Sequence, residues 1–235
     1  TGCGAGTFMG RAAADTAVEH TRLVLVNGAI GGRVASAWVS PTSPDYDTVR
    51  DMRLAVMGVT EQQVQVVWLK APSAGPYTLP DTRATAFRTK SELGQAVRAL
   101  KVRYPNLQLV FISSRTYGGY ATVPLNPEPF AYEHGFGVKW LIEAQLTQMG
   151  GGGVDPLAGD LDYGTVAPWL AWGPYLWADG LSPRSDGLTW AVTEFQSDGT
   201  HPNTAGTTKV GGLMLDFFKS SPVTRCWFLA AGSCP

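Results

Sequence analysis

The chain has 235 residues, a hydrophobic fraction of 44% and a formal net charge of -1 at pH 7. One globular domain over residues 1–235, with a sizeable core, is expected from this length and composition. The nearly neutral charge leaves no basic excess to follow phosphates, which argues against a nucleic-acid partner. No apolar run approaches the roughly 18 residues of a membrane helix, so we expect no membrane partner.

The chain contains three cysteines and three histidines. Cys226 and Cys234 are near enough in sequence to close a small loop in an oxidising compartment, and unpaired, inert thiols are the alternative. A cysteine pair favours a secreted or periplasmic location, and the compartment otherwise stays open. The spacings match no metal-ligand pattern, so neither a metal nor another cofactor is expected.

Short β-rich runs alternate with amphipathic helical patterns along the chain. In chain order, the patterns predict a strand at 23–27, a helix at 45–57, a strand at 64–69, a helix at 82–104, a strand at 107–112, a helix at 131–149, a short strand within 168–177 and a helix at 204–219. This alternation predicts an α/β fold in which helices cover a parallel sheet.

Functional residues of a parallel sheet gather on the loops beyond the carboxyl ends of its strands. Three such loops follow predicted strands, at 28–32, 70–76 and 113–120. The loop at 198–201 can join them from the last connection. These four loops are therefore expected to converge on one site.

A carboxylate and an imidazole stand close together just before the last predicted helix. Asp198 precedes His201 by three residues, within the segment Ser-Asp-Gly-Thr-His-Pro-Asn at 197–203. A histidine takes a proton from a hydroxyl nucleophile, and a neighbouring aspartate fixes its tautomer and stabilises the imidazolium. The structural alternative is a turn whose Asp caps the helix. The position after an α/β pattern favours a catalytic pair.

Three segments resemble sequence blocks of the SGNH (GDSL-like) hydrolase superfamily, in particular its carbohydrate-esterase-like branch. The segment 198–202, Asp-Gly-Thr-His-Pro, is similar to the terminal Asp-x-x-His block, which supplies the acid and base of a catalytic triad. The segment 27–32, Asn-Gly-Ala-Ile-Gly-Gly, is similar to the second block, and the resemblance assigns an oxyanion-binding amide to Gly32. The segment 67–76 stands where the third block has an oxyanion-binding Asn. It contains no Asn, and Ser73 is the candidate substitute.

The resemblance implies a three-layer α/β/α sandwich around a parallel, flavodoxin-like sheet. It also implies a serine esterase or acetylesterase that hydrolyses O-acyl esters of a small molecule or a polysaccharide without a cofactor. In that enzyme, His201 is the general base and Asp198 is the acid that orients it.

The first block of the family, a Gly-x-Ser after an opening strand, is absent from the chain. We therefore expect the nucleophilic Ser and the first, central strand of the sheet to lie upstream of Thr1. The 235-residue chain alone is then expected to be inactive. Cys3 is the alternative nucleophile within it.

Arg115, Tyr117 and Trp172 are the candidate substrate-binding residues. Arg115 follows a predicted strand, and its fork of donors suits either a substrate carboxylate or hydroxyl, or a structural ion pair. The two aromatic side chains suit either stacking on a sugar ring or packing in the core. The alternative function is a carbohydrate-binding protein that retains the SGNH fold and has lost catalysis.

Overall fold

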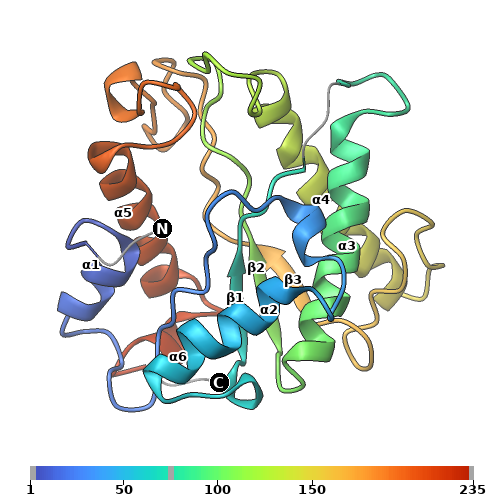
Figure 1. Cartoon of the computed structure of the whole chain (residues 1–235), viewed down its shortest axis with the longest axis vertical. Coiled ribbons are helices and arrows are strands. Elements are labelled where there is room, and N and C mark those ends of the chain that lie inside the picture. Colours follow the sequence, from blue (N-terminus) through green and yellow to red (C-terminus); the bar gives the residue numbers. More distant parts are fainter. Residues whose placement is uncertain (1–3, 74–76, 233–235) are drawn as a thin grey trace.

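The centre of the molecule is a parallel sheet of short strands. The computed structural model describes residues 4–73 and 77–232. Within them the sheet consists, in spatial order, of β1 (Val66–Leu69), β2 (Leu109–Ile112) and β3 (Trp169–Trp172) (Figure 1). Val67 lies opposite Val110, which lies opposite Leu170 on its other side. The strands are rich in β-branched and aromatic side chains, which suit a pleated surface.

Helices supply the crossover connections that parallel strands need. Within the described residues the helices are α1 (Phe8–Ala14), α2 (Pro44–Val49), α3 (Thr85–Arg103), α4 (Phe130–Met149), α5 (Thr204–Ser220) and α6 (Arg225–Phe228). A π-helical turn at Arg50–Leu54 and a 3₁₀ turn at Ala55–Met57 continue α2. Further 3₁₀ turns lie at Ala35–Trp38, Glu61–Gln63 and Val192–Glu194.

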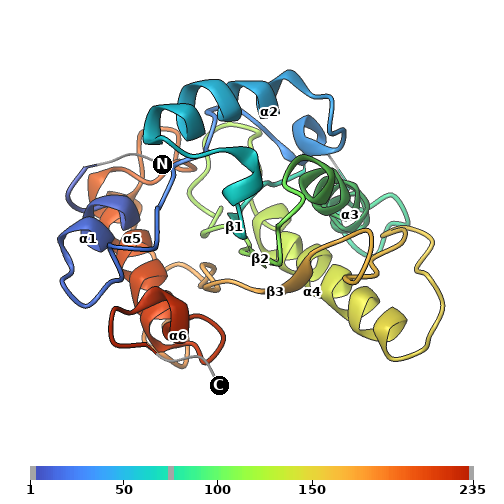
Figure 2. The ribbon, with the colours of Figure 1, turned by 90° about the horizontal axis from the view of Figure 1, so that it is seen from below.

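Helices cover both faces of the sheet, which is therefore the middle of three layers (Figure 2). On one face, α2, α3 and α4 enclose a core that includes Tyr46, Leu93 and Val138. On the other face, α1, α5 and α6 enclose a second core around Phe111 and Phe218. Alternate side chains of each strand point into opposite cores, as the pleat requires.

A chain of side-chain hydrogen bonds ties the carboxyl ends of the three strands together. The indole Nε1 of Trp68 on β1 donates to Oγ of Ser113, directly after β2, over 2.9 Å. The Ser113 hydroxyl donates in turn to the carbonyl of Pro174, just after β3, over 2.7 Å. Gly173 lies so close that an added Cβ would be 2.7 Å from Ser113 Oγ. These contacts fix where the loops after the strands begin.

Helix α5 follows the loop that carries Asp198 and His201, and its start is fixed by an N-cap. Oδ1 of Asn203 accepts hydrogen bonds from the backbone N–H groups of Ala205 at 2.9 Å and Gly206 at 3.3 Å. Such a cap satisfies amides that have no partner within the helix. Further along α5, Met214 and Phe218 are one turn apart and both are buried in the second core. The helix is thereby anchored at its start and along its length.

The structure is an α/β fold with an open, all-parallel sheet. The helices and strands predicted from residue 45 onward are confirmed, with small shifts at their ends. Helices α1 and α6 were not predicted, because elements of seven and four residues are too short to show a helical period.

The strand predicted at 23–27 is wrong. These residues run extended beside β1, with no backbone hydrogen bond to any other described segment. A strand needs a neighbouring backbone about 4.8 Å away. Here a cavity separates residues 23–27 from β1. The apolar pattern of residues 23–27 is thus suited to a strand. These residues do not pair because no described backbone lies close enough to hydrogen-bond with them.

The described residues also bear on the cysteines and on membrane insertion. Cys226 is disulfide-bonded, so it is not a free thiol. Cys3 and Cys234 lie outside the described residues, and the predicted pairing of Cys226 with Cys234 stays a prediction. None of the helices described here has both the length and the apolar character needed to cross a bilayer.

Replacing Val67 by Ala is expected to destabilise the protein less than replacing Val110 by Ala, although the two valines are paired across β1 and β2. Val110 is fully buried, so its truncation leaves a closed void and is expected to cost about 2 kcal/mol. Val67 borders an existing cavity, and its loss is expected to cost about 1 kcal/mol or less. Urea unfolding measures both values. Equal losses would mean that the cavity beside β1 is closed in solution.

Candidate active site

Asp198 and His201 form a hydrogen-bonded pair in the loop before α5. Nδ1 of His201 lies 2.5 Å from Oδ2 of Asp198. Oδ1 of the same carboxylate accepts from the backbone N–H groups of Thr200 and His201, each at 2.9 Å. The His201 side chain is 57% exposed, and its Nε2 has no hydrogen-bond partner among the described residues. This is the arrangement in which an oriented imidazole acts as a general base.

The same contacts keep the Asp198 carboxylate ionised. The hydrogen bond with the His201 side chain, followed by those from the backbone amides of His201 and Thr200, lowers the pKa of Asp198 to about 2. Hydrogen bonds to the charged form of a carboxyl favour that form. At neutral pH the ionised carboxylate therefore accepts a hydrogen bond from Nδ1 of His201 and holds the proton on that nitrogen.

The loop that follows β2 holds this pair in place. The backbone N–H of Thr122 donates to the Asp198 carbonyl over 2.9 Å, and its hydroxyl donates to the Ser197 carbonyl over 3.3 Å. Gly199 packs against the same loop with φ of 65°. An added Cβ at Gly199 would lie 1.7 Å from the carbonyl oxygen of Tyr120. Both the positive φ and the close approach require glycine here.

The other side of the loop is fixed by backbone contacts that lead into α5. Phe195 and Pro202 form an isolated antiparallel bridge, and the N–H of Gln196 donates to the His201 carbonyl over 2.7 Å. Nδ2 of Asn203 donates to the Phe195 carbonyl over 3.0 Å. The loop therefore closes on itself, and its geometry depends on backbone groups of both its ends.

A cavity of about 1440 Å³ lies between residues 23–30 and the free edge of β1. Within the described residues β1 pairs only with β2, so its other edge has no strand partner. All four residues of β1 are only partly buried, whereas three of the four in β2 are buried. The blue segment that follows α1 and the strand β1 both run upward in Figure 1, so residues 23–27 and β1 have the same direction. Two extended segments with the same direction thus face each other across the cavity.

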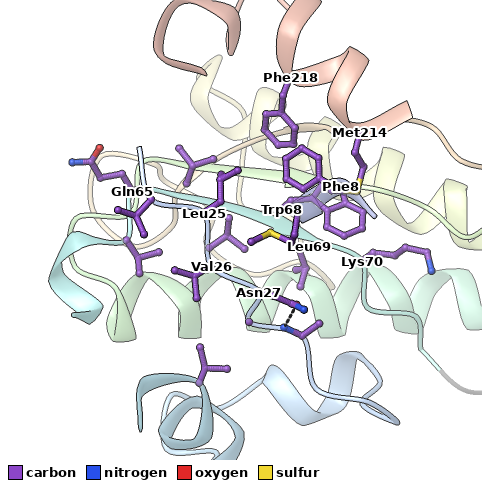
Figure 3. Close-up of a pocket in the computed structure, with 18 of the residues that line it drawn as sticks. Phe8, Leu25, Val26, Asn27, Gln65, Trp68, Leu69, Lys70, Met214 and Phe218 are labelled. Atoms are coloured by element: carbon purple, nitrogen blue, oxygen red, sulfur yellow. Dashed lines mark hydrogen bonds between the residues drawn. The ribbon is translucent and has the colours of Figure 1, made fainter. Parts of the chain in front are cut away.

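The walls of this cavity are apolar on both faces of the sheet (Figure 3). On one face, Trp68 lies with Met214 and Phe218 of α5 in the second core. On the other face, Val26 and Leu69 belong to the core under α2, α3 and α4. Anything that occupies the cavity is therefore covered by apolar side chains on both sides.

The structure brings the four predicted loops together at this cavity. Its lining includes Asn27, Lys70, Thr116 and His201, one residue from or beside each loop. A backbone hydrogen bond of 2.9 Å from the N–H of Ala35 to the Pro72 carbonyl also joins the segment after the glycine turn to the loop after β1. These residues stand at the carboxyl edge of the sheet, where α/β proteins bind their ligands.

The two candidate oxyanion donors differ in their placement. Gly32 has φ of 72° and lies on the exposed turn between Ile30 and Arg33, both of which line the cavity. Ser73 is fully buried, and its hydroxyl donates to Oε2 of Glu92 over 2.5 Å. Its proton is thus engaged away from His201, and Ser73 does not line the cavity.

None of the three candidate substrate-binding residues is among the residues that line the cavity. The ring of Tyr117 packs edge-on against Tyr120 at 5.0 Å, and Trp172 packs edge-on against Tyr175 at 5.6 Å. Neither Tyr117 nor Trp172 is in the lining of the cavity. Arg115 is 8% exposed and precedes Thr116, which is in the lining. Of the three, only Arg115 stands next to a cavity residue in the chain.

Sequence reasoning missed Lys70 and Thr122 as individual residues of the site. The available signal for Lys70 is a charged residue directly after an apolar strand, a position at the carboxyl edge of the sheet. The role of Thr122 depends on backbone contacts with Ser197 and Asp198, far away in the sequence, which no local pattern encodes. No cluster of three or more potential metal ligands occurs in the described part of the chain.

Replacing Gly199 by Ala is expected to displace the loop that carries Asp198 and His201 and to destabilise the protein by about 1–3 kcal/mol, because the new Cβ overlaps the Tyr120 carbonyl at a positive φ. Gly153→Ala is the matched control, since an added Cβ there has nothing within 4 Å. Urea unfolding and amide NMR shifts measure both effects. A folded Gly199→Ala protein with native shifts at 198–201 would contradict this packing.

The stability contributed by the Asp198 carboxylate is expected to disappear in acid. Its folded-state pKa is lowered from an ordinary value of 3.8 to about 2, so the contribution is complete well above pH 4 and is lost as the pH falls to about 2. The difference in unfolding free energy between the native protein and Asp198→Asn should therefore be constant from pH 7 to about pH 5 and shrink below it. Urea unfolding at stepped pH tests this. A constant difference down to pH 2 would rule out the carboxylate's role.

No protein-family model, curated protein or solved structure matches this chain. Its function is therefore to be inferred from its own side chains: a hydrogen-bonded Asp198–His201 pair at the carboxyl edge of a parallel sheet, beside an apolar cavity.

Proposed function

We propose that the protein is a serine ester hydrolase of the SGNH type, with a flavodoxin-like sheet, that cleaves O-acyl groups from a small molecule or a polysaccharide. The Asp198–His201 pair is the single observation that carries the proposal. It combines a carboxylate kept ionised, an imidazole held through Nδ1, and an Nε2 left without a partner among the described residues. A turn that serves only to start a helix needs none of these features, because Asn203 already caps α5.

The nucleophile of this reaction is a serine that follows a strand in the cavity beside β1. The cavity supports this because it separates two extended segments of the same direction, each without a strand partner on its facing side. A single parallel strand satisfies both edges, and its side chains enter the two apolar walls. None of the strands in the described residues, 4–73 and 77–232, occupies this place. A residue directly after this strand lies at the same edge of the sheet as His201.

The reaction then follows from the roles of these groups. The serine Oγ attacks the ester carbonyl while Nε2 of His201 takes its proton, and the new oxyanion accepts hydrogen bonds from backbone amides. We assign these amides to Gly32 and to the serine itself, because the Ser73 hydroxyl is bound to Glu92. His201 returns the proton to the leaving alcohol. A water molecule then repeats the two steps on the acyl-enzyme and releases the acid.

The alternative from another class is a catalytically inactive carbohydrate-binding protein with the same fold. It would use exposed aromatic rings as platforms for sugars. Tyr117 packs against Tyr120 and Trp177, and Trp172 packs against Tyr175. Rings that are engaged with one another favour a packing role, so the esterase is the better supported function.

The protein, prepared with any residues that are encoded upstream of Thr1, is expected to hydrolyse p-nitrophenyl acetate and to be labelled on one serine by a fluorophosphonate. His201→Ala should lower kcat/KM by at least about 10³-fold, because the general base is lost. His20→Ala is the matched control, since His20 is exposed and its only hydrogen bond within the described residues is to the Asp15 carbonyl. Steady-state kinetics and mass spectrometry of the labelled peptide provide the two measurements.

Two outcomes of this experiment would contradict the proposal, one for the activity and one for the role of His201. A folded protein prepared in this way that neither turns over nor labels would leave the carbohydrate-binding alternative. Wild-type turnover in His201→Ala would remove the imidazole from the mechanism even if the protein is an esterase.

A further inference from the structure

Two buried or half-buried cations at the carboxyl edge of the sheet have no direct ion-pair partner among the described residues. Arg115, three residues after β2, is 8% exposed, and its Nε is fully buried without a hydrogen-bond partner. Lys70, directly after β1, has no hydrogen bond or ion pair among the described residues. By contrast, Arg103 pairs with Glu61 at 2.6 Å, as partly buried cations in folded proteins usually do.

The two cations are near each other. Burial lowers the pKa of Lys70 to about 7, and the positive charge of Arg115 contributes to this shift. Burial likewise lowers the pKa of Arg115 to about 10, opposed by the charge of Glu128. Two like charges held together in a poorly solvated place are costly unless an anion joins them.

The nearby carboxylates are engaged elsewhere. Oε1 of Glu128 accepts from the N–H of Gly118 at 2.9 Å and from Nε1 of Trp177 at 2.8 Å, and Oε2 accepts from the N–H of Tyr132 at 3.0 Å. Glu92 accepts from Ser73. Neither carboxylate is hydrogen-bonded to Arg115 or Lys70, so no carboxylate in residues 4–73 and 77–232 pairs directly with the two cations.

Two neutral polar groups beside these cations also lack a partner among the described residues. Oγ of Ser114, adjacent to Arg115 in the chain, and Nδ1 of His134 are buried and make no hydrogen bond there. Burial, with the charges of Arg115 and Lys70, lowers the pKa of His134 to about 3, so the ring is uncharged at neutral pH. Because buried polar atoms in folded proteins almost always have a partner, such atoms call for an explanation, and a bound ligand supplies one.

We propose that Lys70 and Arg115 bind the carboxylate of the substrate, so that the substrate is an O-acyl ester of an acidic compound such as a uronic acid. Calling the ligand a substrate rests on the proposed esterase function. The planar fork of a guanidinium matches a carboxylate, and an ammonium adds a second charge. Lys70 and His201 line the same cavity, and Arg115 adjoins the lining residue Thr116 in the chain, so the proposed anion site and the proposed base belong to one cavity.

Binding of D-glucuronate and D-glucose to the 235-residue chain tests this proposal, because the two sugars differ in the carboxylate. Isothermal titration calorimetry should show at least about tenfold tighter binding of glucuronate. Lys70→Gln and Arg115→Gln should each weaken glucuronate binding by about tenfold or more, the loss expected for one charge-assisted hydrogen bond. Lys139→Gln is the control, since Lys139 is exposed and pairs with Glu143.

Several results would overturn the assignment. These are equal binding of the two sugars, native affinity in Lys70→Gln, or tighter binding of inorganic phosphate than of glucuronate. Circular dichroism shows whether Arg115→Gln folds, and if it does not, Lys70→Gln decides. The measurement needs no turnover. Selective binding of glucuronate by a protein that proves inactive would therefore support the anion site and contradict the esterase proposal. Ester hydrolysis without selectivity for acidic sugars would support the esterase proposal and contradict the anion site.

Discussion

The hydrogen bonds from Trp68 to Ser113 and from Ser113 to Pro174 are the contacts on which the functional edge of the molecule depends. They join the three strands at the point where each one ends. Lys70 and Arg115 lie within two residues of Trp68 and Ser113, so this junction determines where they stand. The loop after β2, whose Thr122 binds the Asp198 carbonyl, also begins at Ser113. A site that draws side chains from distant parts of the chain needs such a rigid origin.

Local patterns predicted the elements from residue 45 to α5 and the hydrogen-bonded Asp198–His201 pair, and they failed where distant contacts decide. The spacing of Asp198 and His201, three residues apart in a turn, already limits how far their side chains can separate, so the pair could be predicted. The state of residues 23–27 could not, because an apolar run becomes a strand only if a partner backbone lies beside it. The engagement of Ser73 by Glu92 and the isolation of Arg115 depend on which side chains of α3 and α4 meet the loops, and no pattern within one segment carries that information.

The proposed base and the proposed anion site share one edge but are built differently. His201 is exposed and held by backbone contacts, so its loop can be complete without a ligand. Arg115 and the orphaned atoms around it are buried, so a bound anion changes their energy far more than it changes that of His201. An acidic substrate would thus gain affinity at the buried cations, and its ester would meet a base that is already in place.

The free edge of β1 has a consequence for behaviour in solution. An unpaired strand edge is a template for pairing with another chain, and natural proteins protect such edges with charges, prolines or bulges. Val66, Val67, Trp68 and Leu69 offer none of these protections. Concentrated samples of the 235-residue chain would therefore tend to associate edge to edge, and a strand seated in the cavity would act as the chain's own protection against self-association.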